Sequence, residues 1–449
     1  MLRQPRRVRR IVANALPVLA IAIATGVASA AEVEAERSTG LPGGGDWTFN
    51  LDLGVGAFGF DNSVYTNQRP DPSGDLSDDW FESYIKPALS VDFPMKRGAL
   101  FAKLSGVGVR TFSAPPTLVG DDASSFDIED AYVGWRSGDS LGGTDDLLQI
   151  TLGRAPYHLG HGMLIWDGAG DGGSRGGFWS GARSAWESSA VGRLQSGPNT
   201  VEIFYLDRDE LPEADTGTSF GGANYELKLS ESTTFGLSYL IADSNELLRD
   251  NMDIYNARAY TAPFKRLPGL SFELEYAYEE NGDALSSTAY SAQVGYTMSN
   301  IAWTPRLSYR YAFFEGDDPA TTRSEGFDML FPGFYDWGTW WQGEIGGEYF
   351  LSNSNLISHQ VRLHLEPREG LSAGVIGYAF QLDHAASFGP GVTSDDVALE
   401  VDGYLDWEIN SNFTASFVLA YAEPDDAIEQ GFGRTESLSY GMVYLSYSY

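Results

Sequence analysis

The stretch LSYGMVYLSYSY, residues 438–449, decides the fold class. Gly441, Val443, Leu445, Tyr447 and Tyr449 occupy every second position, which predicts a strand with one apolar face that ends on an aromatic ring. A lipid-facing strand of an outer-membrane barrel needs this pattern, because the ring sits at the membrane interface while the backbone pairs with the first strand and leaves no edge. The stretch therefore predicts an all-β, transmembrane antiparallel β-barrel.

The same alternation recurs along the chain between turn signals, and it predicts about eighteen strands, an even number as bacterial single-chain barrels require. The predicted strands are Trp47–Phe60, Trp80–Phe93, Ala99–Phe112, Phe126–Ser137, Leu147–Ala155, Arg183–Gln195, Thr200–Asp207, Ser219–Leu229, Thr233–Ala242, Met252–Pro263, Leu270–Glu279, Ser286–Met298, Trp303–Glu315, Leu356–Pro367, Leu371–Asp383, Asp396–Ile409, Phe413–Ala422 and Glu436–Tyr449.

The connections between these strands alternate in length. Long ones such as Asp61–Asp79 are followed by tight ones such as Pro94–Gly98. Short turns face the periplasm and long loops face outward in such barrels, which predicts that both termini are periplasmic. The segment Trp337–Phe350 could be another strand, but accepting it would give an odd number, so we assign it to a long loop. We expect Pro156–Ala182 or Gly316–Asn355 to fold into the pore, since long loops in barrels commonly constrict it.

Composition narrows the domain organisation and the partners. Residues 1–30 have the basic start, apolar run and small-residue end of a secretory signal, 31–45 form a short periplasmic segment, and 46–449 form one outer-membrane barrel domain. The net charge of −33 argues against nucleic acid as a partner. The absence of cysteine excludes disulfides and thiolate metal sites. Outer-membrane lipid is the expected surrounding.

The two-residue period also predicts which charged side chains point into the barrel. In Trp303–Glu315, Leu307 and Tyr309 suit lipid, so Arg306 and Arg310 point inward. A lysine or arginine facing lipid at the bilayer centre would cost ~2–4 kcal/mol, which favours the inward orientation. The same argument places a larger set in the lumen, with Trp186 on the opposite, lipid-facing side of its strand. The set is Lys86, Lys103, Arg136, Arg183, Arg193, Arg306, Arg310, Arg362, Glu82, Asp130 and Glu187.

Two interpretations of this inward basic set stay open. The arginines could form an anion-selective pathway, because guanidinium groups bind carboxylates in a bidentate manner and can exchange them from site to site. Alternatively, they could pair with interior carboxylates and brace a wide barrel. Arg136, Arg310 and Arg362 are predicted to lie on different strands, well inside the strand ends, where they would form an electropositive band.

Several short motifs, in order, resemble the outer-membrane alginate export family. They are Leu152-Gly153-Arg154 before a glycine-rich loop, Arg183-Ser-Ala-Trp186-Glu187, YAFFEGDD at 311–318, and Gly343-Glu344 ahead of Ser354-Asn355-Leu356. The resemblance spans about Phe126 to Pro367. It implies an eighteen-stranded barrel with an arginine- and lysine-lined lumen and loops that narrow the pore. It also implies outward passage of an anionic uronate polymer, with periplasmic export partners and Arg136, Arg154, Arg183, Arg193, Arg310 and Arg362 along the pathway.

Metal binding and catalysis are alternatives to a plain channel. The loop Asp167–Gly177 (DGAGDGGSRGG) could hold calcium, but it lacks the spacing of a known calcium loop and is better explained as a flexible glycine loop, so no cofactor is expected. An enzyme barrel is a rival, yet no nucleophile motif appears and no catalytic set is placed on one lumen face. A diffusion porin is the main alternative, and an adhesive or structural barrel the weaker one.

Overall fold

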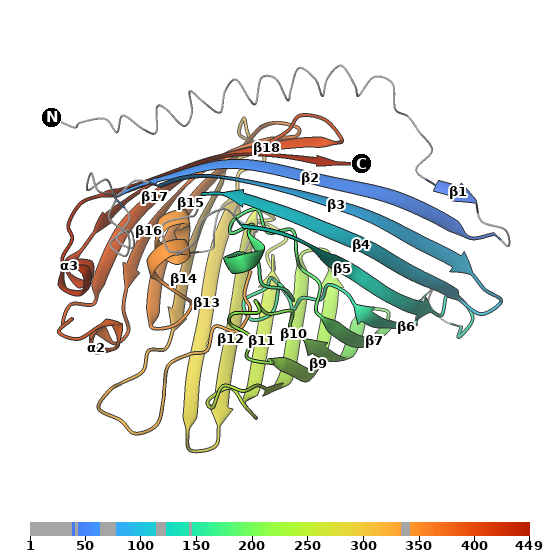
Figure 1. The fold of residues 1–449 in the computed structure, drawn as a ribbon, viewed down its shortest axis with the longest axis horizontal. Helices are drawn as coiled ribbons and strands as arrows, with labels where there is room; N and C mark the ends of the chain where they lie inside the picture. The colour runs from blue at the N-terminus through green and yellow to red at the C-terminus, as the bar shows by residue number, and fades with distance from the viewer. Residues whose placement is uncertain (1–37, 41–43, 63–77, 114–122, 143–145, 334–341) are drawn as a thin grey trace.

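The computed structural model describes residues 38–40, 44–62, 78–113, 123–142, 146–333 and 342–449. The predicted signal segment, much of Asp61–Asp79 and the start of Trp337–Phe350 lie outside these residues. Eighteen antiparallel strands, β2 to β19, pair with their chain neighbours, and β19 pairs with β2 to close the ring (Figure 1). The closed eighteen-stranded barrel is confirmed.

The strands have these bounds: β1 Ser38–Gly40, β2 Asp46–Asp61, β3 Asp78–Pro94, β4 Ala99–Phe112, β5 Ala123–Arg136, β6 Leu148–Arg154, β7 Ser188–Ser196, β8 Asn199–Asp207, β9 Ser219–Ser230, β10 Thr233–Asp243, β11 Asp253–Thr261, β12 Leu270–Asn281, β13 Leu285–Thr297, β14 Arg306–Phe314, β15 Leu356–Arg368, β16 Leu371–Gln381, β17 Asp396–Glu408, β18 Phe413–Pro424 and β19 Leu438–Ser448. The short β1, which was not predicted, pairs with the start of β2.

Helical segments are short and lie in the connections. They are the 3-10 turn Gly173–Arg175, the π-helix Gly343–Phe350, α2 Ala385–Phe388 and α3 Asp426–Phe432. The side chain of Asp425 accepts a hydrogen bond from the first backbone N–H of α3, and Gly433 ends the helix with φ +69°. Within the described residues, no helix is both long enough and apolar enough to span a membrane.

The last residue closes the barrel as the terminal pattern predicted. Leu51 and Tyr449 exchange two backbone hydrogen bonds of 3.0 Å. Both residues lie at the end of the barrel with the short turns, which we assign to the periplasm. Nine connections, most of them longer, join the strands at the other end, and two of them matter below: L3 (155–187, between β6 and β7) and L7 (315–355, between β14 and β15).

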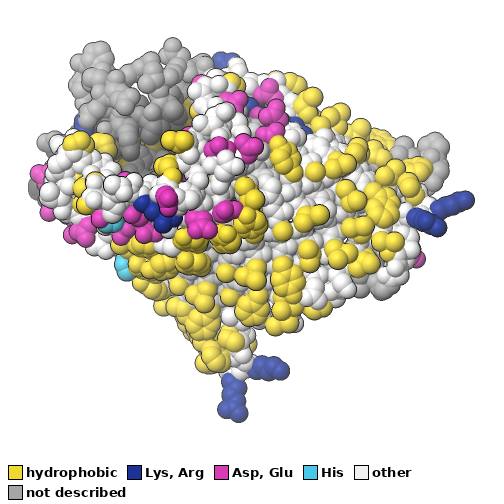
Figure 2. Space-filling model, turned by 90° about the horizontal axis from the view of Figure 1, so that it is seen from below, with side chains coloured by type: hydrophobic (Ala, Val, Ile, Leu, Met, Phe, Trp, Pro, Cys, Tyr) yellow, Lys and Arg dark blue, Asp and Glu magenta, His cyan; other side chains and the backbone are white. Residues whose placement is uncertain are grey.

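Strand alternation separates a lipid face from an interior. In β10, Phe235, Leu237 and Ile241 are exposed, whereas Ser238 and Leu240 between them are buried. Exposed apolar side chains are spread over the face of the barrel that Figure 2 shows. A hydrocarbon environment around this surface explains why so many large apolar side chains are exposed.

In β5 the odd–even alternation of the two faces changes phase part-way along the strand. Phe126 and Ile128 face outward, as does Val133, because the pairing with β4 shifts register between Leu104 and Gly106. This irregularity turns two successive residues, Glu129 and Asp130, toward the interior. The two outward side chains fit the lipid face, so the bulge preserves the apolar outer surface.

The predicted strand Arg183–Gln195 begins five residues too early. Strand β7 starts at Ser188, and the preceding residues belong to L3. Trp186, predicted to face lipid, is completely buried inside the barrel, and Glu187, predicted to face the lumen, is exposed just before the strand. The period-two rule failed here because it was applied to residues that are not in a strand.

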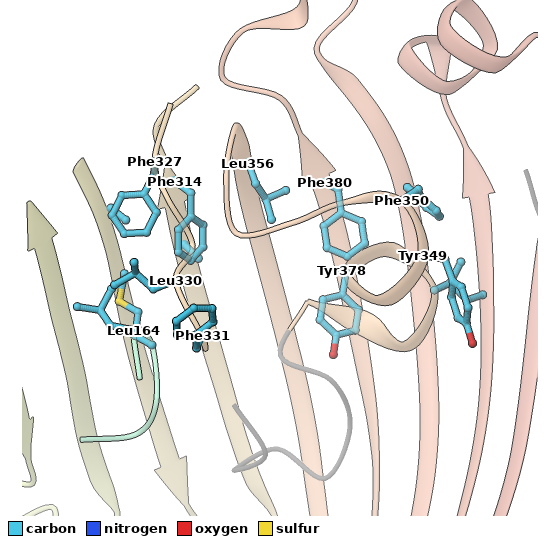
Figure 3. Packing of buried hydrophobic residues seen from close by; sticks show 14 of the residues in the cluster. Leu164, Phe314, Phe327, Leu330, Phe331, Tyr349, Phe350, Leu356, Tyr378 and Phe380 are labelled. Atoms are coloured by element: carbon cyan, nitrogen blue, oxygen red, sulfur yellow. The ribbon is translucent and has the colours of Figure 1, made fainter. Parts of the chain in front are cut away.

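L3 and L7 both fold into the barrel, as expected from their length. Ile165 of L3 forms an isolated backbone bridge with Phe331 of L7. Figure 3 shows Leu164, Phe327, Leu330 and Phe331 packed together beside Phe314 of β14. At the π-helix of L7, Phe350 lies near Phe380 of β16, whereas the Tyr349 ring packs against Phe60 and Tyr440 at centroid distances of 4.6 and 6.2 Å (Figure 3).

Large aromatic side chains complete this packing. The Trp186 ring meets Phe220 and Phe331 edge to face at centroid distances of 6.1 and 6.3 Å. Arg208 stacks over the Phe331 ring with its guanidinium carbon 3.6 Å from the ring centre, and burial lowers the pKa of Arg208 to about 10. We call the buried apolar residues of L3 and L7, with the strand residues that they contact, the plug. It occupies the interior at the long-loop end.

Candidate channel lumen

A polar row crosses the inner wall from β5 to β11. Each member is the direct cross-strand partner of the next, so all share one face. The row is Arg136, Gln149, Arg193, Glu202, Asn224, Ser238 and Asn256. Because Glu202, Asn224, Ser238 and Asn256 are buried inside the barrel, the two arginines of the row also face the interior.

Three arginines near the short-turn end remain accessible on the inner face. The side chains of Arg136, Arg193 and Arg306 are 34%, 46% and 29% exposed. Arg193 lies 3.1 Å from Glu202 and Arg306 lies 3.7 Å from Glu273, while Arg136 pairs with Asp92 and lies 3.8 Å from Asp146. These guanidinium groups combine partial exposure with nearby carboxylates. Arg136 is the last residue of β5, so its predicted place well inside the strand is wrong.

Two lysines predicted to face the lumen do so. Each pairs with one of the two successive carboxylates, Glu129 and Asp130, that the β5 bulge turns inward. Lys103 lies 2.9 Å from Asp130, whose other contact is a 2.6 Å hydrogen bond from the Ser105 hydroxyl. Lys86 lies 3.1 Å from Glu129 and also donates to the Ala182 carbonyl of L3 at 3.0 Å. Lys86 therefore links the wall to the loop, whereas Lys103 is more exposed.

Arg310 and Arg362 lie well inside their strands, as predicted, but both are buried. Arg310 donates to the Gln293 side-chain oxygen at 3.0 Å. Arg362 donates to the Tyr404 hydroxyl at 2.8 Å, and His364 lies beside the same hydroxyl at 2.7 Å. Both arginines point into the barrel, and their burial was not foreseen from the sequence.

Arg183 anchors L3 to the wall. Its side chain is fully buried, with one nitrogen 2.7 Å from Asp171 and another 2.8 Å from Asp127. Burial raises the pKa of Asp171 to about 6 even though Arg183 opposes that shift, and the carboxylates beside Arg183 raise the pKa of the guanidinium despite its burial. Breaking such a buried pair commonly costs ~3–5 kcal/mol. This arrangement makes Arg183 a loop-positioning residue.

Arg154 also holds L3, through an irregular backbone. Its position has the parity of the exposed residues Ile150 and Leu152, yet its guanidinium donates to the Glu129 carbonyl and pairs with Asp209. Gly153 has φ +119°, and a Cβ there would meet the Ala131 carbonyl oxygen at 2.4 Å, so glycine is required for this turn. The Leu152-Gly153-Arg154 motif thus redirects an arginine from the lipid side to the loop.

Backbone N–H groups of L3 are bound by two buried carboxylates. Glu129 accepts from the backbone of Ser184 at 2.8 Å, and Glu82 accepts from the backbone of Ser180 at 2.7 Å. Sequence reasoning placed Glu82 inward but gave it no role, and missed Glu129 because the bulge was not anticipated. Carboxylates that accept backbone hydrogen bonds fix a loop more firmly than surface charges do.

L7 is attached in the same way to β17, four strands along the ring from β3, which carries Glu82. Glu400 of β17 accepts hydrogen bonds from the backbone of Ile345 and Gly346 at 2.8 and 2.7 Å, and Asp402 accepts from Glu344 at 3.1 Å. These acceptors face the first turn of the π-helix Gly343–Phe350, where N–H groups have no partner within the helix. Neither carboxylate was singled out from the sequence, although both lie at even, inward positions of a predicted strand.

Arg258 is the main lumen arginine that sequence reasoning missed. It is buried and donates to Ser238 at 2.8 Å and Asn224 at 2.7 Å, with Glu226 at 3.2 Å. Its alternation with the exposed Tyr255 and the outward Ala257 in the predicted strand Met252–Pro263 was the available signal. Arg175 was missed as well; it lies 2.7 Å from Asp209 and so joins L3 to the second residue after β8.

The loop Asp167–Gly177, considered above for calcium, makes contacts within the protein. Asp171 pairs with Arg183, and the backbone of Gly172 bonds that of Gly176. Among the residues that the structure describes, no cluster of three histidine, aspartate or glutamate side chains could hold a metal ion. His359 and His364 bond Tyr309 and Tyr404 on opposite faces of β15.

A protein-family model described as alginate export matches residues 110–389. The chain belongs to the alginate export family. This match covers the plug and most of the strands that carry the inward arginines, and it confirms the resemblance noted in the sequence. No curated protein matched the chain.

Solved outer-membrane porins share the fold of this family member at low sequence identity. OccK9 (OpdG) of Pseudomonas aeruginosa is 13% identical, with 90% of this chain and 98% of that chain covered and a TM-score of 0.60. A BenF-like porin from Pseudomonas fluorescens Pf-5 is 12% identical, with 90% and 98% covered and a TM-score of 0.58. P. aeruginosa OpdK, solved with vanillate, is 12% identical, with 89% and 98% covered and a TM-score of 0.56. The family member is an outer-membrane β-barrel channel.

Proposed function

We propose that this alginate export family member passes anionic, carboxylate-bearing saccharides of the uronate type across the outer membrane, with export as the direction. The observation that carries the proposal is the group of half-exposed inward arginines, Arg136, Arg193 and Arg306. A sugar carboxylate reaching any of them would compete with the carboxylate already there.

Such competition suits transport better than tight binding. A guanidinium group can bind an incoming carboxylate with two hydrogen bonds, and the resident carboxylate regains its partner when the solute moves on. Arg136 and Arg193 lie in the same row with one strand, β6, between them, so two spacings of 4.7–4.9 Å put their backbones roughly 10 Å apart. This spacing allows a uronate chain to leave one arginine as it meets the next.

The test is ion selectivity of the purified channel in planar bilayers. Replacing Arg136, Arg193 and Arg306 with Gln should lower the anion preference measured from the reversal potential in a salt gradient, and weaken current block by oligouronates. The matched control replaces Lys96, Arg97 and Arg266 with Gln, which removes equal charge from exposed turns at the same end. An unchanged reversal potential and unchanged block in the lumen variant would contradict the proposal and favour bracing.

A second candidate function is selective diffusion of small carboxylates. The plug favours it, because residues such as Met163, Ile165 and Trp186 are fully buried and fill part of the interior. A polymer could pass only if L3 or L7 moved, whereas a small solute needs less room. OpdK, the similar structure solved with vanillate, is a precedent for small ligands in this fold. Block by monouronates but not by oligouronates would support this function over export.

A further inference from the structure

Positive charge on the outer surface is concentrated on two turns at the short-turn end. The β3–β4 turn presents the exposed residues Met95, Lys96 and Arg97. The β11–β12 turn presents Phe264, Lys265, Arg266 and Leu267, all exposed. Figure 2 shows lysine and arginine side chains projecting at two separate points beyond the apolar surface, away from the main acidic region. In a chain of net charge −33, this concentration needs an explanation.

The β3–β4 turn is held rigidly at the membrane boundary. Met95 donates its N–H to the Gly98 carbonyl at 2.9 Å, and the Trp135 indole donates to the Arg97 carbonyl at 3.0 Å. Gly98 has φ +81°, and a Cβ there would meet the Arg136 carbonyl at 1.9 Å. Tryptophan is typical of barrel interfaces, so this contact places Lys96 and Arg97 beside the lipid headgroups.

The β11–β12 turn lies at the same boundary. The Phe264 ring packs edge to face against Phe272, with centroids 6.3 Å apart, and Phe272 has the parity of the lipid-facing Leu274. Leu267 is 48% exposed on the other side of the basic pair. Apolar side chains that flank a basic pair can enter the hydrocarbon edge while the charges stay at the headgroups.

We propose that these two turns bind the phosphate groups of anionic phospholipids in the periplasmic leaflet. Basic side chains next to an anionic membrane surface are attracted to it, and the flanking Met95, Phe264 and Leu267 supply apolar contact. The two turns are eight strands apart in the eighteen-stranded ring, so they contact lipid on nearly opposite sides of the barrel and limit its tilt. An acidic periplasmic protein would match the charge but would leave the exposed apolar residues unexplained.

The experiment uses the full chain in mixed phosphatidylcholine and phosphatidylglycerol nanodiscs, with retained lipids counted by native mass spectrometry. The wild type should retain phosphatidylglycerol preferentially. Replacing Lys96, Arg97, Lys265 and Arg266 with Gln should lower this preference about tenfold, and each turn pair alone should lower it less. The control replaces Lys228 and Arg368 with Gln, since these basic residues lie at the same end beside Glu231 and Glu369. It should retain the wild-type preference.

Folding is checked in every variant by heat-modified gel mobility. Equal retention of the two lipids by the wild type, or an unchanged preference in the quadruple variant, would overturn the proposal. A quadruple variant that keeps its lipid preference but loses binding to polyglutamate would assign the turns to an acidic protein instead. Labelling of an Arg97→Cys variant on intact cells would also overturn it, because the turn would then face outward.

Discussion

The two ends of the barrel interior differ although the same strands build both. At the long-loop end, inward positions of β10 and β14 are apolar, with Leu240, Ala242 and Phe314 fully buried in the plug. Toward the short turns, the inward positions of the same strands are Ser238 and Arg310. Each of these strands thus has two inner segments, an apolar one that packs against the folded loops and a polar one nearer the short turns. A wide barrel can therefore contain a protein-like core and a polar channel at once.

The largest effect on conductance should come from removing the L7 part of the plug at the long-loop end of the interior. Replacing residues 318–353 of L7 with a short Gly-Ser linker removes Phe327, Phe331 and the π-helix, so the outer half should open. We expect single-channel conductance to rise several-fold, while selectivity set by the polar end stays anionic. Unchanged conductance would show that L7 does not limit the pathway.

A smaller effect is expected from a single plug residue. Trp186→Ala removes a fully buried ring, a loss that typically costs ~3–5 kcal/mol in folding free energy. Because L3 is also held by Arg183, the barrel should persist while the loop opens more often. Current recordings should show more frequent transitions to a higher-conductance level, and the lipid-facing variant Leu237→Ala serves as the control. Equal transition frequencies in both variants would argue against a plug role.

Acidity should favour the closed position of L3. Burial raises the pKa of Asp171 to about 6 from an ordinary value near 4, so the closed loop holds its proton more tightly than the open loop. This contribution to closure is complete below the ordinary pKa and is lost as pH rises through about 6. L3 opening should therefore be rarer at pH 4 than at pH 7. Asp171→Asn should remove this dependence, and a pH response that is identical in the variant would exclude Asp171 as its source.

The smallest effect should arise within the polar end itself. Tyr404→Phe removes the hydroxyl that Arg362 and His364 share, at a typical cost of about 1 kcal/mol. Because Arg362 is buried, we expect anion selectivity to change less than in the Arg136, Arg193 and Arg306 variant. A larger change in the reversal potential would show that Arg362 contributes to the pathway and does not only brace the wall.

The sequence by itself was enough to predict the strands of the barrel wall and the direction of many of their side chains. Alternation from Trp47 to Tyr449 predicts all eighteen barrel strands, because the lipid face demands an apolar side chain at every second position. The cost of a charge in hydrocarbon likewise gives the inward direction of Lys86, Lys103, Arg306, Arg310 and Arg362 without any structure.

Only the tertiary structure decided which inward residues are accessible. Arg183 and Arg193 look alike in the sequence, yet the first is buried between Asp171 and Asp127 while the second is 46% exposed beside Glu202. The difference depends on where L3 and L7 fold, and a loop carries no period from which its contacts could be read. Trp186 illustrates the same limit, since its burial depends on Phe220 and Phe331, which meet it only after the barrel has closed around both loops.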